Sequence, residues 1–270
     1  MFARAGFEAK PKEAPAAVPT AAAAAAAPAA EAKNACPPAL KKAIDESYEK
    51  FIKNKEGDTT SEGEKWELVN QTDVAKIWRA KLPGQSVYRW RAEQTLYGPK
   101  SGIVAELFDF SKRAGPNGWD EKLKAGRIHK QYDDNYRVAI FSSNPVFGGV
   151  ISSREFIEAR VIKPEQPDGG YLVAGMGLDE KIWGPVLGDD FPKGDKSCTR
   201  ALAFPGGGFC MSPVTPGTNP ETPQEWKCQL VMATLLGGWI PTGTINAASA
   251  QVMTEAAVAQ RDHMLKKFKQ

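Results

Sequence analysis

The sequence is poor in the residue types that metal and acid–base chemistry require. Its 270 residues include two histidines, His129 and His263, so a zinc site or a catalytic imidazole has very few candidates. Its four cysteines show no C-x-x-C spacing, and we recognise no signal peptide before them. This pattern favours reduced thiols over a disulfide framework. We therefore expect no metal and no other cofactor.

Long hydrophobic runs and an excess of one charge are also missing. No apolar run reaches the roughly 18 residues that a membrane span needs. The formal net charge is +3, and no block of basic residues is interleaved with aromatic residues. We therefore expect a soluble protein without a nucleic-acid partner.

The N-terminal segment is rich in alanine and proline. Its prolines interrupt any alanine helix before the helix can propagate. They are Pro11, Pro15, Pro19 and Pro28. We predict a disordered tail over residues 1–36 and one folded domain over residues 37–270. Acidic residues such as Glu8 and Glu13 argue against a mitochondrial transit peptide, so we expect a cytoplasmic protein, with mitochondrial targeting as the alternative.

The longest helical pattern occupies residues 237–268. Two neighbouring rows of apolar and small residues recur there at helical spacing. The rows are Ile245, Ala248, Val252, Ala256 and Ala259, and Met253, Ala257, Met264 and Phe268. At about 1.5 Å per residue, some 25 residues span roughly 38 Å, enough to cross a domain. The pattern predicts either a lid over a sheet or a plain packed terminal helix.

The rest of the folded part reads mainly as sheet. An amphipathic helix begins after Pro38 and ends near Gly57, and strand patterns follow at 66–70, 74–82 and 87–97. We expect two short helical segments, at 103–110 and 119–123, and about six further strands before the long helix. The order predicts an α+β domain with an antiparallel sheet of about nine strands and no internal repeat.

Four motifs in this order resemble a known family. They are NGWDEKL around Trp119 and Asp120, SSREFIEAR at 152–160, AGMGLDE at 174–180 and GGWIPTGTIN at 237–246. Together, over about residues 38–267, they resemble the START domain, the steroidogenic-acute-regulatory-related lipid-transfer family. The resemblance implies a helix-grip fold, in which a curved antiparallel sheet surrounds the C-terminal helix and a tunnel holds one lipid. It implies lipid binding and transfer between membranes without catalysis.

The resemblance also places a polar anchor at Arg160. In sterol-binding members an acid on the preceding strand pairs with this arginine, and here Phe141 stands at that position. Arg160 then needs another acid or an anionic ligand, and Glu158, about 7 Å away on the same strand face, is the candidate acid. Alternation alone favours the opposite arrangement, in which the apolar residues around Ile157 face inward and Arg160 faces solvent.

Apolar residues on the strands and the long helix complete the predicted lipid-binding wall. They are Phe141, Met176, Met232, Ile245, Val252 and Ala256. The loop at 144–151 is the predicted door, because apolar residues there flank two glycines that permit hinge motion. Its predicted gate residues are Val146, Phe147, Gly148, Gly149 and Val150. A loop folded onto its own core is the alternative.

Two other functions compete with lipid transfer. Related helix-grip folds include cyclases and hydrolases, and an enzyme would need acid and base groups that converge in the pocket. The candidates for these groups are His129, Glu106 and Asp179. A lipid-sensing interaction module is the third possibility. For the carrier we expect a lipid ligand, transient contact with a membrane surface, a peripheral location at membranes and a monomer.

Overall fold

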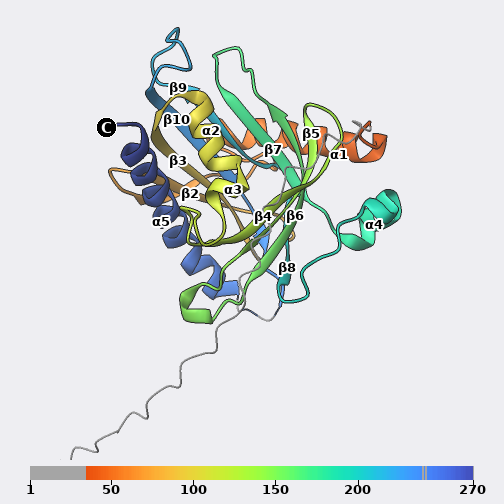
Figure 1. Ribbon diagram of the computed structural model, residues 1–270. Coiled ribbons are helices and arrows are strands. Elements are labelled where there is room, and N and C mark those ends of the chain that lie inside the picture. Colours follow the sequence, from red (N-terminus) through yellow and green to blue (C-terminus); the bar gives the residue numbers. More distant parts are fainter. Residues whose placement is uncertain (1–34, 239, 241, 270) are drawn as a thin grey trace, which may run out of the picture. The chain divides into compact units, whose positions relative to one another are not determined.

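The computed structural model describes residues 35–238, 240 and 242–269, so most of the predicted tail lies outside the described residues. The first element is helix α1 (Pro38–Lys55; Figure 1), which starts where Pro38 suits the first turn and ends close to the predicted Gly57. Cys36, the last residue assigned to the tail, is buried against the apolar face of α1. The folded part therefore includes Cys36.

One large sheet forms the body of the domain. Its nine consecutive neighbours run in the order β1-β2-β3-β10-β9-β7-β6-β5-β4, and every neighbouring pair is antiparallel. The strands of this path are β1 (Glu67–Gln71), β2 (Ala75–Lys81), β3 (Tyr88–Gly98), β4 (Leu123–Gln131), β5 (Tyr136–Ser143), β6 (Arg154–Lys163), β7 (Tyr171–Gly177), β9 (Gly207–Pro213) and β10 (Gln224–Met232).

Two further strands raise the number to eleven in the described chain, against the nine expected. Strand β8 (Thr199–Ala203) pairs with the start of β6 in parallel, and β11 (Thr234–Leu235) pairs with β8. Ala233 alone separates β10 from β11. The sheet is otherwise antiparallel, as predicted.

The short helices differ from the prediction in two places. Helices α2 (Lys100–Phe108) and α3 (Phe110–Arg113) follow β3, but the helical turn expected at 119–123 is a bend that leads into β4. A helix that was not predicted, α4 (Glu180–Leu187), follows β7 and continues into the 3-10 turn η2 (Gly188–Asp190). Another 3-10 turn, η1 (Phe147–Gly149), lies between β5 and β6.

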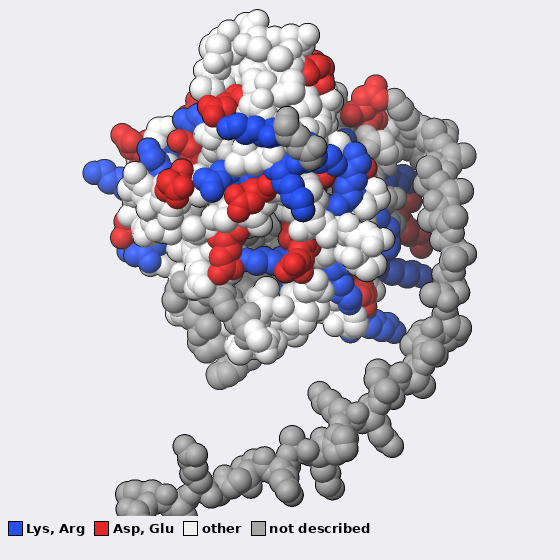
Figure 2. Space-filling view, turned by 60° about the vertical axis from the view of Figure 1, so that its left-hand side comes forward, with Lys and Arg blue, Asp and Glu red and all other residues white. Residues whose placement is uncertain are grey.

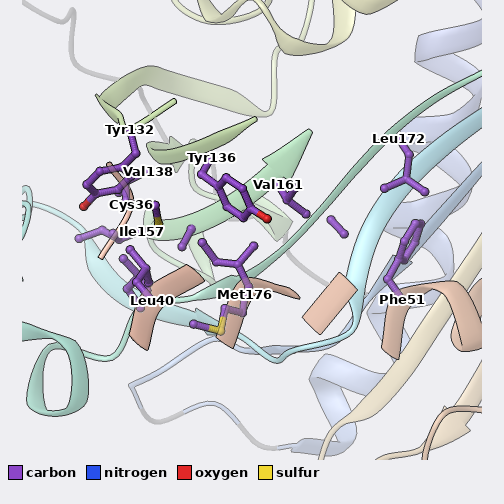
Figure 3. Packing of buried hydrophobic residues seen from close by; sticks show 14 of the residues in the cluster. Cys36, Leu40, Phe51, Tyr132, Tyr136, Val138, Ile157, Val161, Leu172 and Met176 are labelled. Carbon is purple, nitrogen blue, oxygen red and sulfur yellow. The ribbon is translucent and has the colours of Figure 1, made fainter. Parts of the chain in front are cut away.

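The sheet has a helix on each face. On one face, α1 buries Leu40, Ile44 and Phe51 completely against side chains of β5, β6 and β7, and Figure 3 shows part of this cluster. We call it the α1 core. Complete burial of such side chains contributes about 1.5–3 kcal/mol each.

On the other face runs the long helix α5 (Thr242–Phe268; Figure 1). Met253 and Ala257 pack on β2 and β3, and Met264 is buried beside α2. The second of the two predicted rows is therefore the one that contacts the sheet. At its end, the Phe268 ring lies so close to Gly102 that a Cβ there would be 2.7 Å from it.

Charges on the surface are mixed. On the face drawn in Figure 2, lysine and arginine side chains alternate with aspartate and glutamate side chains. Exposed ion pairs of the described chain include Arg79–Glu67 and Lys41–Asp45. Pairs of this kind contribute little to stability.

Candidate functional site: a cavity under the C-terminal helix

A partly open cavity of about 310 Å³ is lined by the sheet face opposite α1 and by residues of α2, α3 and α5. Its volume lies near the lower end of the roughly 300–1,000 Å³ typical of small-molecule sites. Most of its wall is apolar, and aromatic rings supply a large part of it. The apolar lining residues include Leu107, Phe108, Phe110, Phe141, Phe156 and Phe209. Charged side chains reach it from Arg113, Glu158 and Arg160.

Strand β6 separates this cavity from the α1 core by simple alternation. Ile157 and Val161 point into the α1 core, whereas Phe156, Glu158 and Arg160 line the cavity. Both sets are inside the domain, because each face of the sheet is covered. Ile157 and Arg160 therefore both point into the domain, toward opposite faces of the sheet.

Glu158 is the carboxylate that pairs with Arg160. The Arg160 Nη2 atom lies 2.8 Å from Glu158 Oε2, and Nε donates to the same oxygen at 2.9 Å. The two side chains are 16% and 17% exposed. The guanidinium also lies over the Phe141 ring, 5.1 Å from its centroid, which adds a cation–π contact. At the position where the resemblance implies an acid, the ring of Phe141 thus contacts Arg160.

Stacked rings form the wall next to this pair. The ring centroids of Phe141 and Phe156 lie 4.9 Å apart with the rings almost parallel, and the centroid of Phe110 lies 6.2 Å from that of Phe141 in a stacked arrangement. Gly126 makes room for Phe110, because a Cβ at Gly126 would lie 2.2 Å from the Phe110 ring. The stack ties α3 to β4, β5 and β6.

The Trp119–Asp120 motif forms a corner that links α2 and α3 to β4. The Trp119 indole donates to the Glu106 carbonyl at 3.0 Å, and Asp120 pairs with Arg113 at 2.8 Å. Arg113 lines the cavity but also donates to the Leu107 carbonyl. Sequence reasoning missed Arg113, although its position seven residues before Asp120 across a turn is a usable signal.

A buried carboxylate joins α2 to α5. Glu106 is 3% exposed and accepts hydrogen bonds from His263 Nε2 at 2.7 Å and from Lys267 Nζ at 2.6 Å. The Trp119 ring stacks on His263 at 4.7 Å. Burial would raise the pKa of Glu106, but the hydrogen bonds from Lys267 and His263 outweigh it and hold the pKa below its usual value. We call Glu106, His263 and Lys267 the α2–α5 cluster.

Several predicted wall residues do not reach the cavity. Met176 belongs to the α1 core, because it alternates with Gly175 and points to the other face of β7. Ile245, Val252 and Ala256 are half-buried on α5 and are not among its lining residues. These four residues therefore do not form the predicted wall of the cavity.

Two side chains mark where α5 and β10 border the cavity. From α5 the described lining residue is Gln260, whose side chain accepts a hydrogen bond from Gln94 Nε2 at 2.6 Å. Met232 does line the cavity and is 36% exposed, so it lies at a rim. Gln260 escaped sequence reasoning because an isolated glutamine on a helix face carries no distinguishing pattern.

The predicted gate loop is a short closed turn. Val146 and Ile151 exchange two backbone hydrogen bonds at 2.9 and 3.2 Å, and Gly148 and Gly149 adopt positive φ angles of 64° and 92°. Both glycines are exposed, and Val150 is 73% exposed. The side chain of Phe147 lies outside the described part. Ile151 is buried, so the base of the loop packs on the domain while its tip meets solvent.

Backbone and ion-pair contacts connect the base of this loop to α5. The Asn144 amide donates to the Lys122 carbonyl at 2.9 Å, and the Lys122 ammonium pairs with Glu255 on α5 at 2.6 Å. The base of the loop is therefore linked to α5 through Lys122, and the role of the loop as a gate stays a prediction.

The three candidate residues for catalysis lie apart. His129 on β4 contacts the Asp190 carbonyl, Asp179 caps α4 by accepting from the Lys181 amide, and Glu106 belongs to the α2–α5 cluster. None of the three is among the residues that line the cavity. Within the described residues, no three His, Cys, Asp or Glu side chains come together as a metal site.

All four cysteines are free thiols. Burial raises the pKa of Cys36 and of Cys210 to about 11, which keeps both protonated at neutral pH. No helix of the described chain has the length and apolar character needed to cross a bilayer.

An antiparallel sheet, a long C-terminal helix across one face and an apolar cavity between them define a helix-grip domain. Residues 46–270 match the family model of the START domain, so the chain belongs to the START family and the predicted resemblance is confirmed. No curated protein matches the chain in sequence.

Solved structures with the same fold share little sequence with this chain. Human StAR-related lipid transfer protein 5 has a TM-score of 0.66 at 15% identity, with 84% of this chain and 97% of that chain covered. Human STARD10 has a TM-score of 0.59 at 14% identity, with 74% and 73% covered. A STAR-related lipid transfer protein from Xanthomonas axonopodis has a TM-score of 0.55 at 16% identity, with 74% and 98% covered. These likenesses confirm the helix-grip fold.

Proposed function

We propose that the protein binds one hydrophobic molecule in the cavity and transfers it between membranes. The observation that carries this proposal is a mostly aromatic and aliphatic cavity lined in part by the Glu158–Arg160 pair. Exposing an acyl chain to water costs about 0.8 kcal/mol per methylene, so a chain of roughly sixteen carbons would carry more than 10 kcal/mol in solution. An apolar cavity removes that penalty during transfer.

Membership of the START family supports lipid as the ligand class, and two of the structural neighbours carry lipid transfer in their names. In this proposal the apolar wall holds the chain of the lipid. Arg160, Glu158 and Phe141 contact its polar end, and Met232 borders the entrance.

We propose that the gate loop makes transient contact with the membrane. Val150 is the most exposed large apolar side chain among the described residues. It lies next to Gly148 and Gly149 in a loop whose base is linked to α5 through Lys122. Exposed apolar tips of this kind enter the bilayer interface. Cytoplasmic location and the monomeric state remain predictions.

The test combines loading with transfer. Native mass spectrometry of freshly expressed full-length protein, followed by lipid extraction, should show one intact lipid per chain. Turnover of the bound molecule would favour the enzyme instead, and an empty protein would favour the interaction module.

Transfer between vesicles should slow about tenfold in Val150→Asp, because a carboxylate opposes entry into the interface, while lipid affinity stays unchanged. Val214→Asp is the matched control, since Val214 is 51% exposed but follows β9, whose connection to β10 lies at the opposite end of the domain from η1 in Figure 1. Equal transfer rates in both variants would remove the gate from the proposal.

A further inference from the structure

A second arginine lies beside Arg160 on the cavity face of the sheet. Tyr136, Val138 and Ile140 of β5 point into the α1 core, so Arg137 and Phe141 point to the opposite face, where Phe141 lines the cavity. Arg137 is the direct cross-strand partner of Arg160. Side chains that are opposite each other in an antiparallel pair have Cβ atoms about 4.5–5.5 Å apart.

No described residue balances the charge of Arg137. No hydrogen bond or ion pair joins its side chain to the rest of the described chain, and its Nε atom is buried without a hydrogen-bond partner. Burial, and secondarily the nearby Arg160, lower the pKa of Arg137, whereas Tyr171 raises it. Like charges placed directly opposite on a sheet are destabilising.

The acids that could serve Arg137 have other partners. Glu158 is the cross-strand partner of Ala139, which lies two residues after Arg137 on β5, and its carboxylate forms an ion pair with Arg160. Asp133, in the turn before β5, accepts from the backbone amides of Asn135 and Tyr136. Arg113, the other arginine at the cavity, already pairs with Asp120. This leaves one uncompensated positive charge on the cavity face of the sheet, directly behind the lining residue Arg160, although Arg137 itself is not among the residues that line the cavity.

We propose that the bound molecule is a single-chain carboxylic acid whose carboxylate lies between Arg137 and Arg160. The inference rests on the proposed function and names its ligand class. A planar carboxylate accepts paired hydrogen bonds from guanidinium groups, which supplies the missing negative charge and relieves the repulsion between the two arginines. The cavity of about 310 Å³ favours one chain over two.

The aromatic surroundings suit this arrangement. Tyr171 is buried next to Phe108, with ring centroids 5.6 Å apart, and both lie on the cavity side of β7. The Arg160 side chain is only 16% exposed, so its guanidinium group is largely shielded from water. A charge-assisted hydrogen bond gains strength in such a setting, whereas a neutral hydroxyl head would leave the excess charge in place.

The experiment compares two ligands that share a chain and differ in the head group. Full-length protein is freed of bound lipid and titrated with oleic acid and with oleyl alcohol at pH 8, where the free carboxyl group is ionised. We expect the acid to bind about tenfold or more tightly than the alcohol. Arg137→Gln should reduce that preference about tenfold with unchanged affinity for the alcohol, and Arg137→Lys should keep most of it.

Arg127→Gln is the control, since Arg127 is exposed on β4, opposite Ile140. It should change neither affinity. Equal binding of acid and alcohol to the parent protein would overturn the inference and leave lipid binding intact. Loss of both affinities in Arg137→Gln would also overturn it, because the residue would then be structural. Failure of both ligands to bind the parent protein would also overturn the inference, whereas the proposed function itself is refuted only if no lipid co-purifies with the protein.

Discussion

The two faces of the sheet are built from the same strands and serve different ends. Under α1, the side chains of Leu40, Ile44 and Phe51 are completely buried in a continuous core. Under α5, rings and a charged pair surround open space. Stability should therefore depend mainly on the first face and ligand binding on the second. Because β6 contributes to both, substitutions one residue apart should separate the two properties.

The largest expected difference between the two faces follows from replacing one phenylalanine on each of them. Phe51→Ala should lower the free energy of unfolding by about 3–5 kcal/mol, since it opens a new hole in a filled core. Phe156→Ala should lower it by only about 1–2 kcal/mol, since its ring already borders open space and makes fewer contacts. Urea unfolding of the ligand-free protein measures both.

Ligand binding should respond in the opposite order. Phe156→Ala changes the affinity for lipid, whereas Phe51→Ala leaves it unchanged under conditions where the variant is folded. Equal losses of stability in the two variants would show that the cavity face is packed as tightly as the α1 core, and the contrast between the faces would be wrong.

A medium effect is expected at the α2–α5 cluster, which fastens α5 on the cavity face. Glu106→Gln should destabilise the protein by about 2 kcal/mol at pH 7, because hydrogen bonds to a buried charge are lost. Since the folded-state pKa of Glu106 lies below its unfolded value, its contribution is present above about pH 4.3 and disappears as pH falls through the folded-state pKa. The parent and the variant should converge in acid.

Hydrogen exchange locates this effect. In Glu106→Gln the amides of α5 should exchange faster at neutral pH, while those of α1 keep their protection. Equal acceleration in both helices would mean that the two faces unfold as one unit and are not separable.

The smallest effect concerns the exposed pair that joins α5 to the corner before β4. Lys122 and Glu255 lie 2.6 Å apart, but their side chains are 39% and 50% exposed. Glu255→Gln should change the free energy of unfolding by less than about 0.5 kcal/mol, since solvent and salt screen such pairs. Thermal unfolding at two salt concentrations measures it, and a loss near that of Glu106→Gln would show that the pair is effectively buried.

Periodicity was sufficient for the elements with long, regular patterns. Helix α1, the first three strands and α5 appear where their apolar spacing predicts them. It failed for short elements. Helix α4 contains Gly184 and Pro185, which read as a connection, and β11 is only two residues long. At 119–123, Trp119 and Leu123 have helical spacing, but the Asp120–Arg113 pair holds the backbone in a bend.

The site was predictable as far as alternation along a strand allows. Alternation grouped Glu158 with Arg160 and set them apart from Ile157, but it could not tell that both faces of β6 are covered. The rows on α5 posed the same difficulty. Neighbouring rows differ by a small rotation, and the shape of the sheet decides that Met253 rather than Val252 is buried. Such choices depend on contacts distant in sequence.

The Phe268 ring packs against Gly98 and Gly102 and anchors the C-terminal end of α5. Met264, His263 and Lys267 also fix the last turns, whereas the described side-chain hydrogen bond nearest the start of the helix is a 3.4 Å contact from Asn246 to the Ser86 carbonyl. Further contacts hold the middle of the helix, where Met253 and Ala257 are buried and Lys122 pairs with Glu255. The anchoring of α5 therefore extends from its last turn along the sheet toward its middle, so a substitution at Gly102 that displaces the Phe268 ring should loosen the final turns first.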